Sequence, residues 1–314
     1  MEDTKLLSFV VPCFNEEEAL PIYYQTMEEL LKDKSVIGDL EYEYWFIDDG
    51  SSDGTLDGIK ALREKDDRVH FVSFSRNFGK EAALFAGLSN ASGEYVVTMD
   101  VDLQDSPDSL KEMYEAVVLE GYDCAAARRT TRKGEGRIRS FFSESFYKVI
   151  NRMADIEIAS GARDYRFMRR VMVDAIVSMG EYNRFSKGIF SWVGFKTKWI
   201  EYENVERSAG STKWSMWKLF AYAMDGIVAF STKLLNLASG LGLSCCFISF
   251  IGLIFVFVRA LLYGDPVAGW PSMMCIIIFI GGLQLLCIGI LSIYLSKTYL
   301  ETKRRPIYIA REKE

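Results

Sequence analysis

The sequence is poor in several residue types that would point to common kinds of site. Its 314 residues include one histidine, six prolines and six cysteines. Neither a P-loop lysine motif nor a GxGxxG motif occurs, so the classes kinase, ATPase and dinucleotide-binding enzyme lose their main support. The cysteines lack metal-ligand spacing, and reduced, structural thiols are expected. His70 opens the strand-like run VHFVSF, which favours a structural role for its imidazole.

Charge is also scarce in two long stretches of the chain. No formal charge occurs between Lys233 and Arg259, and none occurs over residues 266–296. Each stretch exceeds the roughly 20 apolar residues that span a bilayer. Two buried helices of a soluble core are the alternative, but such helices normally carry a polar face. The net charge of −6 argues against a general nucleic-acid binder, so no nucleic-acid partner is expected.

Basic residues at the ends of the apolar stretches predict their orientation. Lysines precede the first stretch and a basic tail follows the second, whereas the short connection between them holds only Arg259. By the positive-inside rule, both ends face the cytoplasm. The expected organisation is a cytoplasmic domain over 1–212, an interfacial amphipathic helix over 213–231, two transmembrane helices over 232–298 and a cytoplasmic basic tail over 299–314. Ordinary core packing is the alternative for 213–231. A multi-pass protein of the cell (inner) membrane is therefore predicted.

Apolar runs alternate with helical patterns through the first part of the chain. This alternation is typical of βαβ units on a mostly parallel sheet that helices cover on both faces. In such sheets, ligands bind at the carboxyl ends of the strands. Five apparent strands end in polar pairs: Asn15 and Glu16, Asp48 and Asp49, Arg76 and Asn77, Asp100 and Asp102, and Arg128 and Arg129. An α/β domain with one site at this edge is predicted.

The stretch MDVDLQDSP contains a candidate metal site. Asp100 and Asp102 follow an apparent strand, and hard carboxylate oxygens suit Mg²⁺ or Mn²⁺. Such a pair can also be a helix cap or a solvated turn. Asp105 stands before Pro107 and is expected to cap the next helix, which favours the metal role for the other two aspartates. Asp48, at another strand end, could accept a hydrogen bond from a nucleobase.

Six segments in order carry a resemblance to a known family: VVPCFNEEEAL, IDDGSSDGT, SRNFGKEAAL, MDVDLQDSP, ARDYRFM and ERSAGSTKW. Together with the two apolar stretches, they resemble the polyprenyl-phosphate glycosyltransferases. These are membrane-anchored, inverting family-two enzymes. The resemblance implies a GT-A fold, which is Rossmann-like with a mostly parallel sheet, here with interfacial helices and a C-terminal two-helix transmembrane hairpin.

The resemblance also implies roles for residues near the donor. The positions that match those holding the nucleoside are Pro12, Asn15, Glu16 and Asp48. The positions that match the metal-binding motif are Asp100, Asp102 and Gln104. Mg²⁺ or Mn²⁺ would bridge these residues to the donor diphosphate.

Further positions are implied around the acceptor and the phosphates. Asp164 matches an aspartate near the attacking acceptor, although Arg163 replaces the glycine of the usual GDF setting. The positions that match a mobile phosphate-closing loop are Arg207, Ser211 and Lys213. The positions that match those associated with the lipid phosphate are Arg128, Arg139 and Ser143.

The implied reaction joins one sugar from a nucleotide sugar to undecaprenyl or another polyprenyl phosphate. UDP-glucose is the favoured donor, and UDP-N-acetylglucosamine, UDP-galactose and GDP-mannose are alternatives. The expected partners are the nucleotide sugar, the polyprenyl phosphate, the lipid bilayer and further copies of the chain in a homo-oligomer. A processive synthase of the same fold would have more spans and a QxxRW motif. An inactive membrane-anchored nucleotide-sugar binding protein is the alternative of a different class.

Overall fold

One mixed sheet organises the N-terminal part of the computed structural model, which describes residues 5–129, 159, 161–202, 228–263 and 269–314. The strands lie in the order β7-β5-β6-β4-β1-β2-β3-β8. Their bounds are β1 Leu6–Cys13, β2 Glu41–Asp48, β3 Val69–Phe74, β4 Tyr95–Thr98, β5 Cys124–Arg129, β6 Ala162–Arg169, β7 Thr197–Tyr202 and β8 Ala310–Lys313. β1 to β4 are mutually parallel, whereas β6 is antiparallel to β4 and β5, and β8 is antiparallel to β3. The predicted mostly parallel sheet is confirmed.

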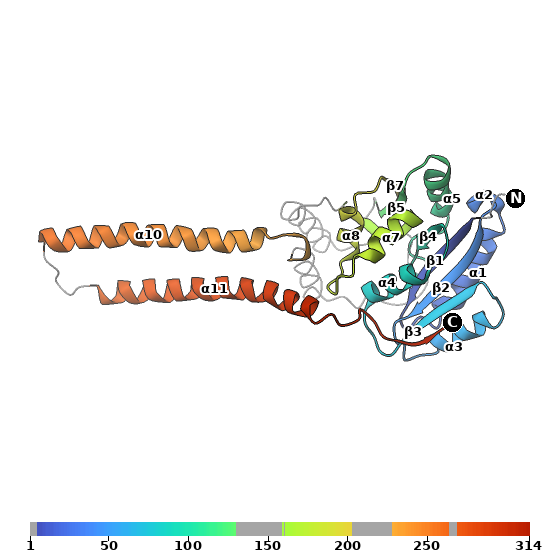
Figure 1. The fold of residues 1–314 in the computed structure, drawn as a ribbon, viewed down its shortest axis with the longest axis horizontal. Helices are drawn as coiled ribbons and strands as arrows, with labels where there is room; N and C mark the ends of the chain where they lie inside the picture. The colour runs from blue at the N-terminus through green and yellow to red at the C-terminus, as the bar shows by residue number, and fades with distance from the viewer. Residues whose placement is uncertain (1–4, 130–158, 160, 203–227, 264–268) are drawn as a thin grey trace.

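Helices cover both faces of this sheet (Figure 1). The described helices are α1 Ala19–Leu31, α2 Lys34–Ile37, α3 Thr55–Arg63, α4 Lys80–Asn90, α5 Ser109–Tyr114 with a π-helical turn at Glu115–Leu119, α7 Arg170–Ser178, α8 Ser186–Trp192, α10 Lys233–Tyr263 and α11 Trp270–Thr302. Side chains of α1, α3 and α5 form the core on one face, and side chains of α4, α7 and α8 form it on the other.

The central position of β1 in the sheet explains why its sequence is apolar almost throughout. Successive side chains of a strand point to opposite faces. Phe9 and Val11 are fully buried in one core, and Val10 is fully buried in the other. A strand covered on both faces therefore reads as a continuous apolar run, as parallel sheets require.

The C-terminal segment returns to the sheet as the edge strand β8. The backbones of Glu314 and Phe71 exchange two hydrogen bonds of 2.9 and 3.1 Å. The Tyr308 ring stacks on Phe74 with 4.7 Å between ring centroids. Residues 299–314, which the sequence predicts only as a basic tail, thus include an edge strand.

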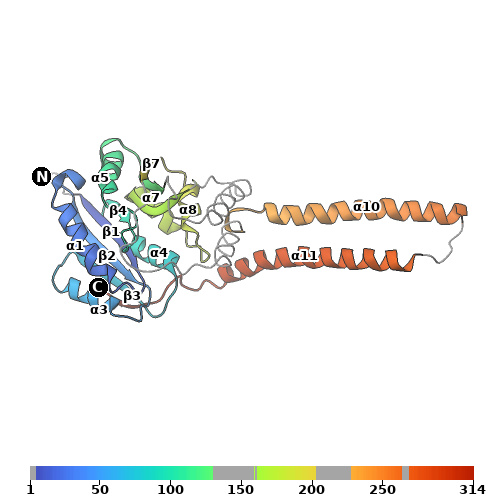
Figure 2. The same ribbon diagram turned by 180° about the vertical axis from the view of Figure 1, so that it is seen from behind.

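α10 and α11 form a long hairpin that extends away from the sheet (Figures 1 and 2). Within the described residues, Lys233–Gly252 and Phe279–Thr302 are long and apolar enough to cross a membrane by length and composition. Large apolar side chains such as Leu243, Phe279 and Leu285 are about 70% exposed (74%, 68% and 71%). The two predicted apolar helices are confirmed as candidate spans. Most of the expected interfacial helix, 213–231, lies outside the described residues.

Candidate active site

The carboxyl ends of β1, β2 and β4 lie side by side in the sheet. Cys13 at the end of β1 is opposite Asp48 at the end of β2, and Val10 is opposite Thr98 at the end of β4. The parallel pairing therefore brings the segments after these three strands to one edge. This is the edge at which the sequence predicted a single site.

Hydrogen bonds tie the turn after β1 to the turn after β2. Asn15 has a left-handed backbone with φ of 55°, and its Oδ1 accepts a 2.9 Å bond from the Ser52 N–H. The Asn15 N–H donates to Ser51 Oγ at 3.0 Å. The Glu16 N–H donates to Thr55 Oγ1 at 2.8 Å. Asn15 and Glu16 thus help to shape the edge of the site through their own backbone and amide contacts.

Asp48 is 1% exposed, and each of its carboxylate oxygens accepts an internal hydrogen bond. Oδ1 accepts from the Ser51 N–H at 2.9 Å, and Oδ2 accepts from the Ser73 hydroxyl at 2.7 Å. A carboxylate oxygen can accept two hydrogen bonds, so capacity for a ligand remains. Pro12, the other predicted nucleoside contact, lies half-buried in β1 opposite Ile47.

Asp49 anchors the loop that leads to α4. Its carboxylate accepts hydrogen bonds from the backbone N–H groups of Phe78 and Gly79 at 2.6 to 3.1 Å. Gly50, with φ of 68°, lies against the same loop, and a Cβ atom there would approach the Arg76 carbonyl carbon to 2.4 Å. Only glycine fits this turn, which fixes the loop before Lys80.

The turn after β4 carries the predicted metal ligands. The Gln104 N–H donates to Asp102 Oδ1 at 3.2 Å, and Leu103 between them has a left-handed backbone with φ of 53°. Asp100 points to a different partner, because both of its carboxylate oxygens contact the Lys80 ammonium, at 2.7 and 2.8 Å. No group of three or more histidine, cysteine, aspartate or glutamate side chains forms a metal site among the described residues.

Asp164 lies on β6 and joins the same cluster. Its Oδ2 is 2.8 Å from the Lys80 Nζ, and its backbone carbonyl accepts a hydrogen bond from the Thr98 hydroxyl. Burial opposes ionisation of this carboxyl, but the charges of Lys80 and then Lys187 outweigh burial and hold the pKa of Asp164 well below its usual range. Asp164 is therefore a permanent anion near neutral pH.

Lys80 is a functional candidate that no sequence motif identified. Burial would lower the pKa of its ammonium, but Asp100 and Asp164 outweigh burial and raise this pKa. A weak signal was present in the sequence: Lys80 opens α4 directly after Gly79, and a cation is unfavourable at the positive end of a helix dipole. A lysine at such a position indicates a partner elsewhere in the fold.

The prediction that Asp105 caps the following helix is wrong. α5 begins at Ser109, and the residue at its N-cap is Asp108. Asp105 is 3% exposed and accepts a hydrogen bond from the Tyr202 hydroxyl, and its Oδ1 is 3.3 Å from Arg163 Nε. Burial raises the pKa of Asp105 and the Arg163 charge opposes this effect. Asp105 therefore contacts residues of β6 and β7, which are distant in sequence, and does not cap α5.

This contact also explains Arg163, which stands where the family pattern has glycine. Its guanidinium reaches both Asp105 and the Tyr202 hydroxyl, the latter at 3.2 Å. The substitution therefore links the turn that carries the predicted metal ligands to β6, the strand that carries Asp164.

Several predicted phosphate-binding residues cannot be placed beside this cluster. Arg128 lies half-buried near the end of β5, opposite Ala162 and Glu201. The others fall outside the described residues: Arg139, Ser143, Arg207, Ser211 and Lys213.

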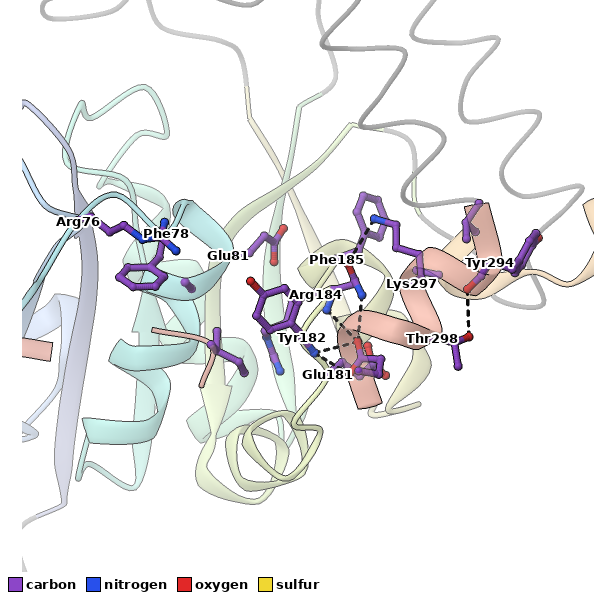
Figure 3. A pocket seen from close by; sticks show the side chains of 16 residues that line it. Arg76, Phe78, Glu81, Glu181, Tyr182, Arg184, Phe185, Tyr294, Lys297 and Thr298 are labelled. Atoms are coloured by element: carbon purple, nitrogen blue, oxygen red, sulfur yellow. Dashed lines mark hydrogen bonds between the residues drawn. The ribbon is translucent and has the colours of Figure 1, made fainter. Parts of the chain in front are cut away.

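A cavity of about 620 Å³ lies where the sheet domain meets the base of the hairpin (Figure 3). Side chains of α4, the loop before α8 and α11 line it, among them Glu81, Arg184 and Lys297. Glu301 of α11 accepts hydrogen bonds from the backbone N–H groups of Tyr182 and Asn183 at 3.0 to 3.1 Å. Of the strand-end residues that predicted a site, Arg76 lines this cavity, and Glu81 of the lining follows Lys80 directly.

The chain is similar in sequence to several known proteins. The model of the family described as glycosyl transferase family 2 matches residues 8–177. The prophage bactoprenol glucosyl transferase homolog of Escherichia coli (strain K12) is 43% identical over 96% of this chain and 97% of that protein. The bactoprenol glucosyl transferase of Shigella phage SfV is 42% identical over 98% and 99%. Among solved structures, glucosyl-3-phosphoglycerate synthase of Mycobacterium tuberculosis is 18% identical, with a TM-score of 0.44 over 71% of this chain and 78% of that one.

Proposed function

The chain belongs to glycosyl transferase family 2, and from that premise we propose that it transfers a single sugar from a nucleotide sugar to a polyprenyl phosphate. The observation that carries this proposal is the similarity of nearly the whole chain, including the hairpin, to proteins named bactoprenol glucosyl transferases. The relatives' names favour glucose, so UDP-glucose is the proposed donor. UDP-N-acetylglucosamine, UDP-galactose and GDP-mannose are the other donors to test.

The apolar hairpin supports a lipid acceptor. A polyprenyl chain leaves the bilayer only at about 0.8 kcal/mol for each methylene exposed to water. An enzyme that uses such an acceptor must therefore work where the phosphate emerges from the membrane. We propose that residues 1–212 form the cytoplasmic glycosyltransferase domain, that 213–231 lie at the interface, and that the hairpin over 232–298 crosses the membrane. Both termini would be cytoplasmic, and a homo-oligomer is proposed.

The chemistry of the acceptor favours an orienting role for Asp164. A phosphate monoester has a second pKa near 6, so it is mostly a dianion at neutral pH and needs little help from a general base. Because Lys80 keeps Asp164 ionised, this carboxylate can accept a hydrogen bond from a sugar hydroxyl. We assign it the positioning of the sugar or the acceptor for inverting attack at the anomeric carbon.

The residues after β4 fit a divalent cation. Asp100, Asp102 and Gln104 supply hard oxygen donors on one turn, and the Lys80 ammonium already contacts Asp100 as a positive charge. These residues would hold Mg²⁺ or Mn²⁺, and the bound ion would neutralise charge on the leaving nucleoside diphosphate.

Basic residues would balance the remaining negative charge. Acceptor phosphate and donor diphosphate repel each other strongly in a poorly hydrated site. We propose that Arg207, Ser211 and Lys213 close on the donor diphosphate. We propose that Arg128, Arg139 and Ser143 hold the acceptor phosphate.

A panel of radiolabelled nucleotide sugars tests this function. Membranes that contain the protein are supplied with undecaprenyl phosphate, and the lipid fraction is assayed for label. We expect UDP-glucose to label the lipid, and we expect Asp102→Ala and added chelator each to abolish labelling. Binding of nucleotide sugars without any lipid product would instead support a nucleotide-sugar binding protein. Full activity in chelator would overturn the metal role.

A further inference from the structure

The Lys80 ammonium lies between two carboxylates that belong to different parts of the site. It contacts both oxygens of Asp100, at 2.7 and 2.8 Å, and Oδ2 of Asp164, at 2.8 Å. Asp100 follows β4, Asp164 lies on β6, and Lys80 opens α4. One flexible side chain therefore bridges the proposed metal ligand to the proposed positioning residue.

A divalent cation on Asp100 would meet this ammonium at close range. A carboxylate can bind a metal and a lysine at once through separate oxygens, but here the ammonium contacts both oxygens of Asp100. Two positive charges a few ångströms apart repel strongly outside bulk water. Metal binding to Asp100 is thus opposed as long as the ammonium stays in place.

Lys80 is placed so that it can leave Asp100. Its side chain is 44% exposed, and the ammonium is carried on a flexible four-carbon stem. The N-terminal end of α4 repels a cation, so the carboxylates hold the ammonium there against the helix dipole. Asp164, whose side chain is 21% exposed, offers a second anchor when contact with Asp100 is lost.

We propose that Lys80 competes with the divalent cation for Asp100, so that the cation binds tightly only together with the nucleotide diphosphate. The added negative charge of the diphosphate compensates for the two cations, and the ammonium then remains on Asp164. Lys80 is thereby a positioning residue that couples donor entry to metal binding. This inference rests on the proposed metal site.

Binding of Mn²⁺ to the full-length protein in detergent tests the competition, because free and bound Mn²⁺ are distinguished by electron paramagnetic resonance. Without nucleotide, Lys80→Met should bind Mn²⁺ roughly tenfold more tightly than the wild type. Lys80→Arg keeps the charge and should bind Mn²⁺ like the wild type. Lys34→Met is the matched control, because Lys34 is 83% exposed and forms its ion pair, among the described residues, with the equally exposed Asp39.

A second measurement adds the nucleotide. In the wild type, UDP should tighten Mn²⁺ binding by at least about tenfold, and Lys80→Met should show a smaller effect of UDP. The inference is overturned if Lys80→Met binds Mn²⁺ no more tightly than the wild type, or if UDP leaves the affinity of the wild type for Mn²⁺ unchanged. Absence of Mn²⁺ binding in every variant, with and without UDP, would overturn the metal site itself, whereas the labelling assay tests sugar transfer separately.

Discussion

At the scale of single residues, the aspartates at the sheet edge divide by what their carboxylates contact. Asp48 and Asp49 are nearly inaccessible, and they accept hydrogen bonds from the turns and the neighbouring strand around them. Asp100 and Asp164 are 33% and 21% exposed at the side chain and contact a lysine. The first pair therefore shapes the site through internal hydrogen bonds, and the second pair is more accessible to a ligand.

Asp164→Asn tests the positioning role on this basis. The amide keeps the shape of the side chain but loses the charge that pairs with Lys80. We expect turnover to fall roughly 100-fold, because a misplaced substrate loses about that factor, while donor affinity stays unchanged. Lipid labelling and calorimetric titration with the donor measure the two quantities.

Asp174→Asn is the matched control, because Asp174 lies on α7 with a side chain that is 66% exposed. Near-normal turnover of Asp164→Asn would remove Asp164 from the catalytic site.

Asp105→Ala tests whether the buried contact with Arg163 stabilises the fold. Removing one partner leaves the other charge buried without compensation, which costs about 3 kcal/mol in comparable pairs. Arg163 is 28% exposed at its side chain, so we expect a loss of about 2 kcal/mol in the free energy of unfolding. Asp108→Ala on the same loop should change it little, since the Asp108 side chain makes no capping hydrogen bond to α5 and accepts only an exposed hydrogen bond from Ser106 among the described residues. Equal effects of the two substitutions would contradict this assignment.

Asp66 makes a pH-dependent contribution to stability. Burial opposes its ionisation, but hydrogen bonds from Arg68 and Tyr24 outweigh burial and lower the pKa of Asp66 from 3.8 to about 2. The folded pKa is lower than the unfolded pKa, so the stabilisation is present above about pH 4 and is lost as the pH falls toward 2.

At pH 7, Asp66→Asn should lower the free energy of unfolding by about 1 to 2 kcal/mol, and this difference should shrink in acid. Urea unfolding at several pH values measures both effects. The neighbouring Asp67 is fully exposed, so Asp67→Asn serves as the control. A difference that persists unchanged at pH 3 would exclude Asp66 as its source.

At the scale of elements, the sequence allowed prediction of those strands whose burial dictates their composition. β1 is apolar because helices cover both of its faces, and the polar residues after it mark its end. β8 has the sequence AREK and is mostly exposed, so no apolar pattern in the sequence predicts this strand. Its position depends on backbone pairing with β3 and on the aromatic contact before it. Likewise, Lys80 meets Asp164 only because the fold brings α4 to β6.

The aromatic contact beside β8 is a test of how firmly this strand is held. Tyr308→Ala removes the ring that stacks on Phe74, and aromatic pairs add about 0.5 to 1.5 kcal/mol beyond the area that they bury. We expect a loss of about 2 kcal/mol in unfolding free energy and faster hydrogen exchange at Phe71 and Ser75, whose N–H groups bond to the C-terminal segment. Ile309→Ala should have little effect, because Ile309 is 53% exposed. Unchanged exchange in Tyr308→Ala would show that the strand pairing does not depend on this ring.

At the scale of the whole molecule, the catalytic domain is connected to the end of the hairpin in two ways, through side-chain contacts and through the chain itself. Glu301 at the end of α11 binds the backbone of the loop at 182–183, and the chain beyond α11 continues into β8. Figures 1 and 2 show the hairpin projecting from this junction. The proposed reaction needs the active site at a fixed height above the bilayer, since the acceptor phosphate cannot move far from the lipid surface. The contacts of Glu301 supply part of that fixation.

Glu301→Ala therefore distinguishes the positioning of the domain above the membrane from the sugar-transfer reaction itself. Loss of the carboxylate releases the N–H groups of Tyr182 and Asn183, and we expect transfer to undecaprenyl phosphate in membranes to fall roughly tenfold through misplacement of the domain. Transfer to a short, water-soluble prenyl phosphate should change less than twofold, because this acceptor reaches the site without the bilayer. Glu301→Gln keeps one accepting oxygen and should retain most of the membrane activity. An equal fall with both acceptors would mean that Glu301 acts through the fold of the domain and not through its height above the membrane.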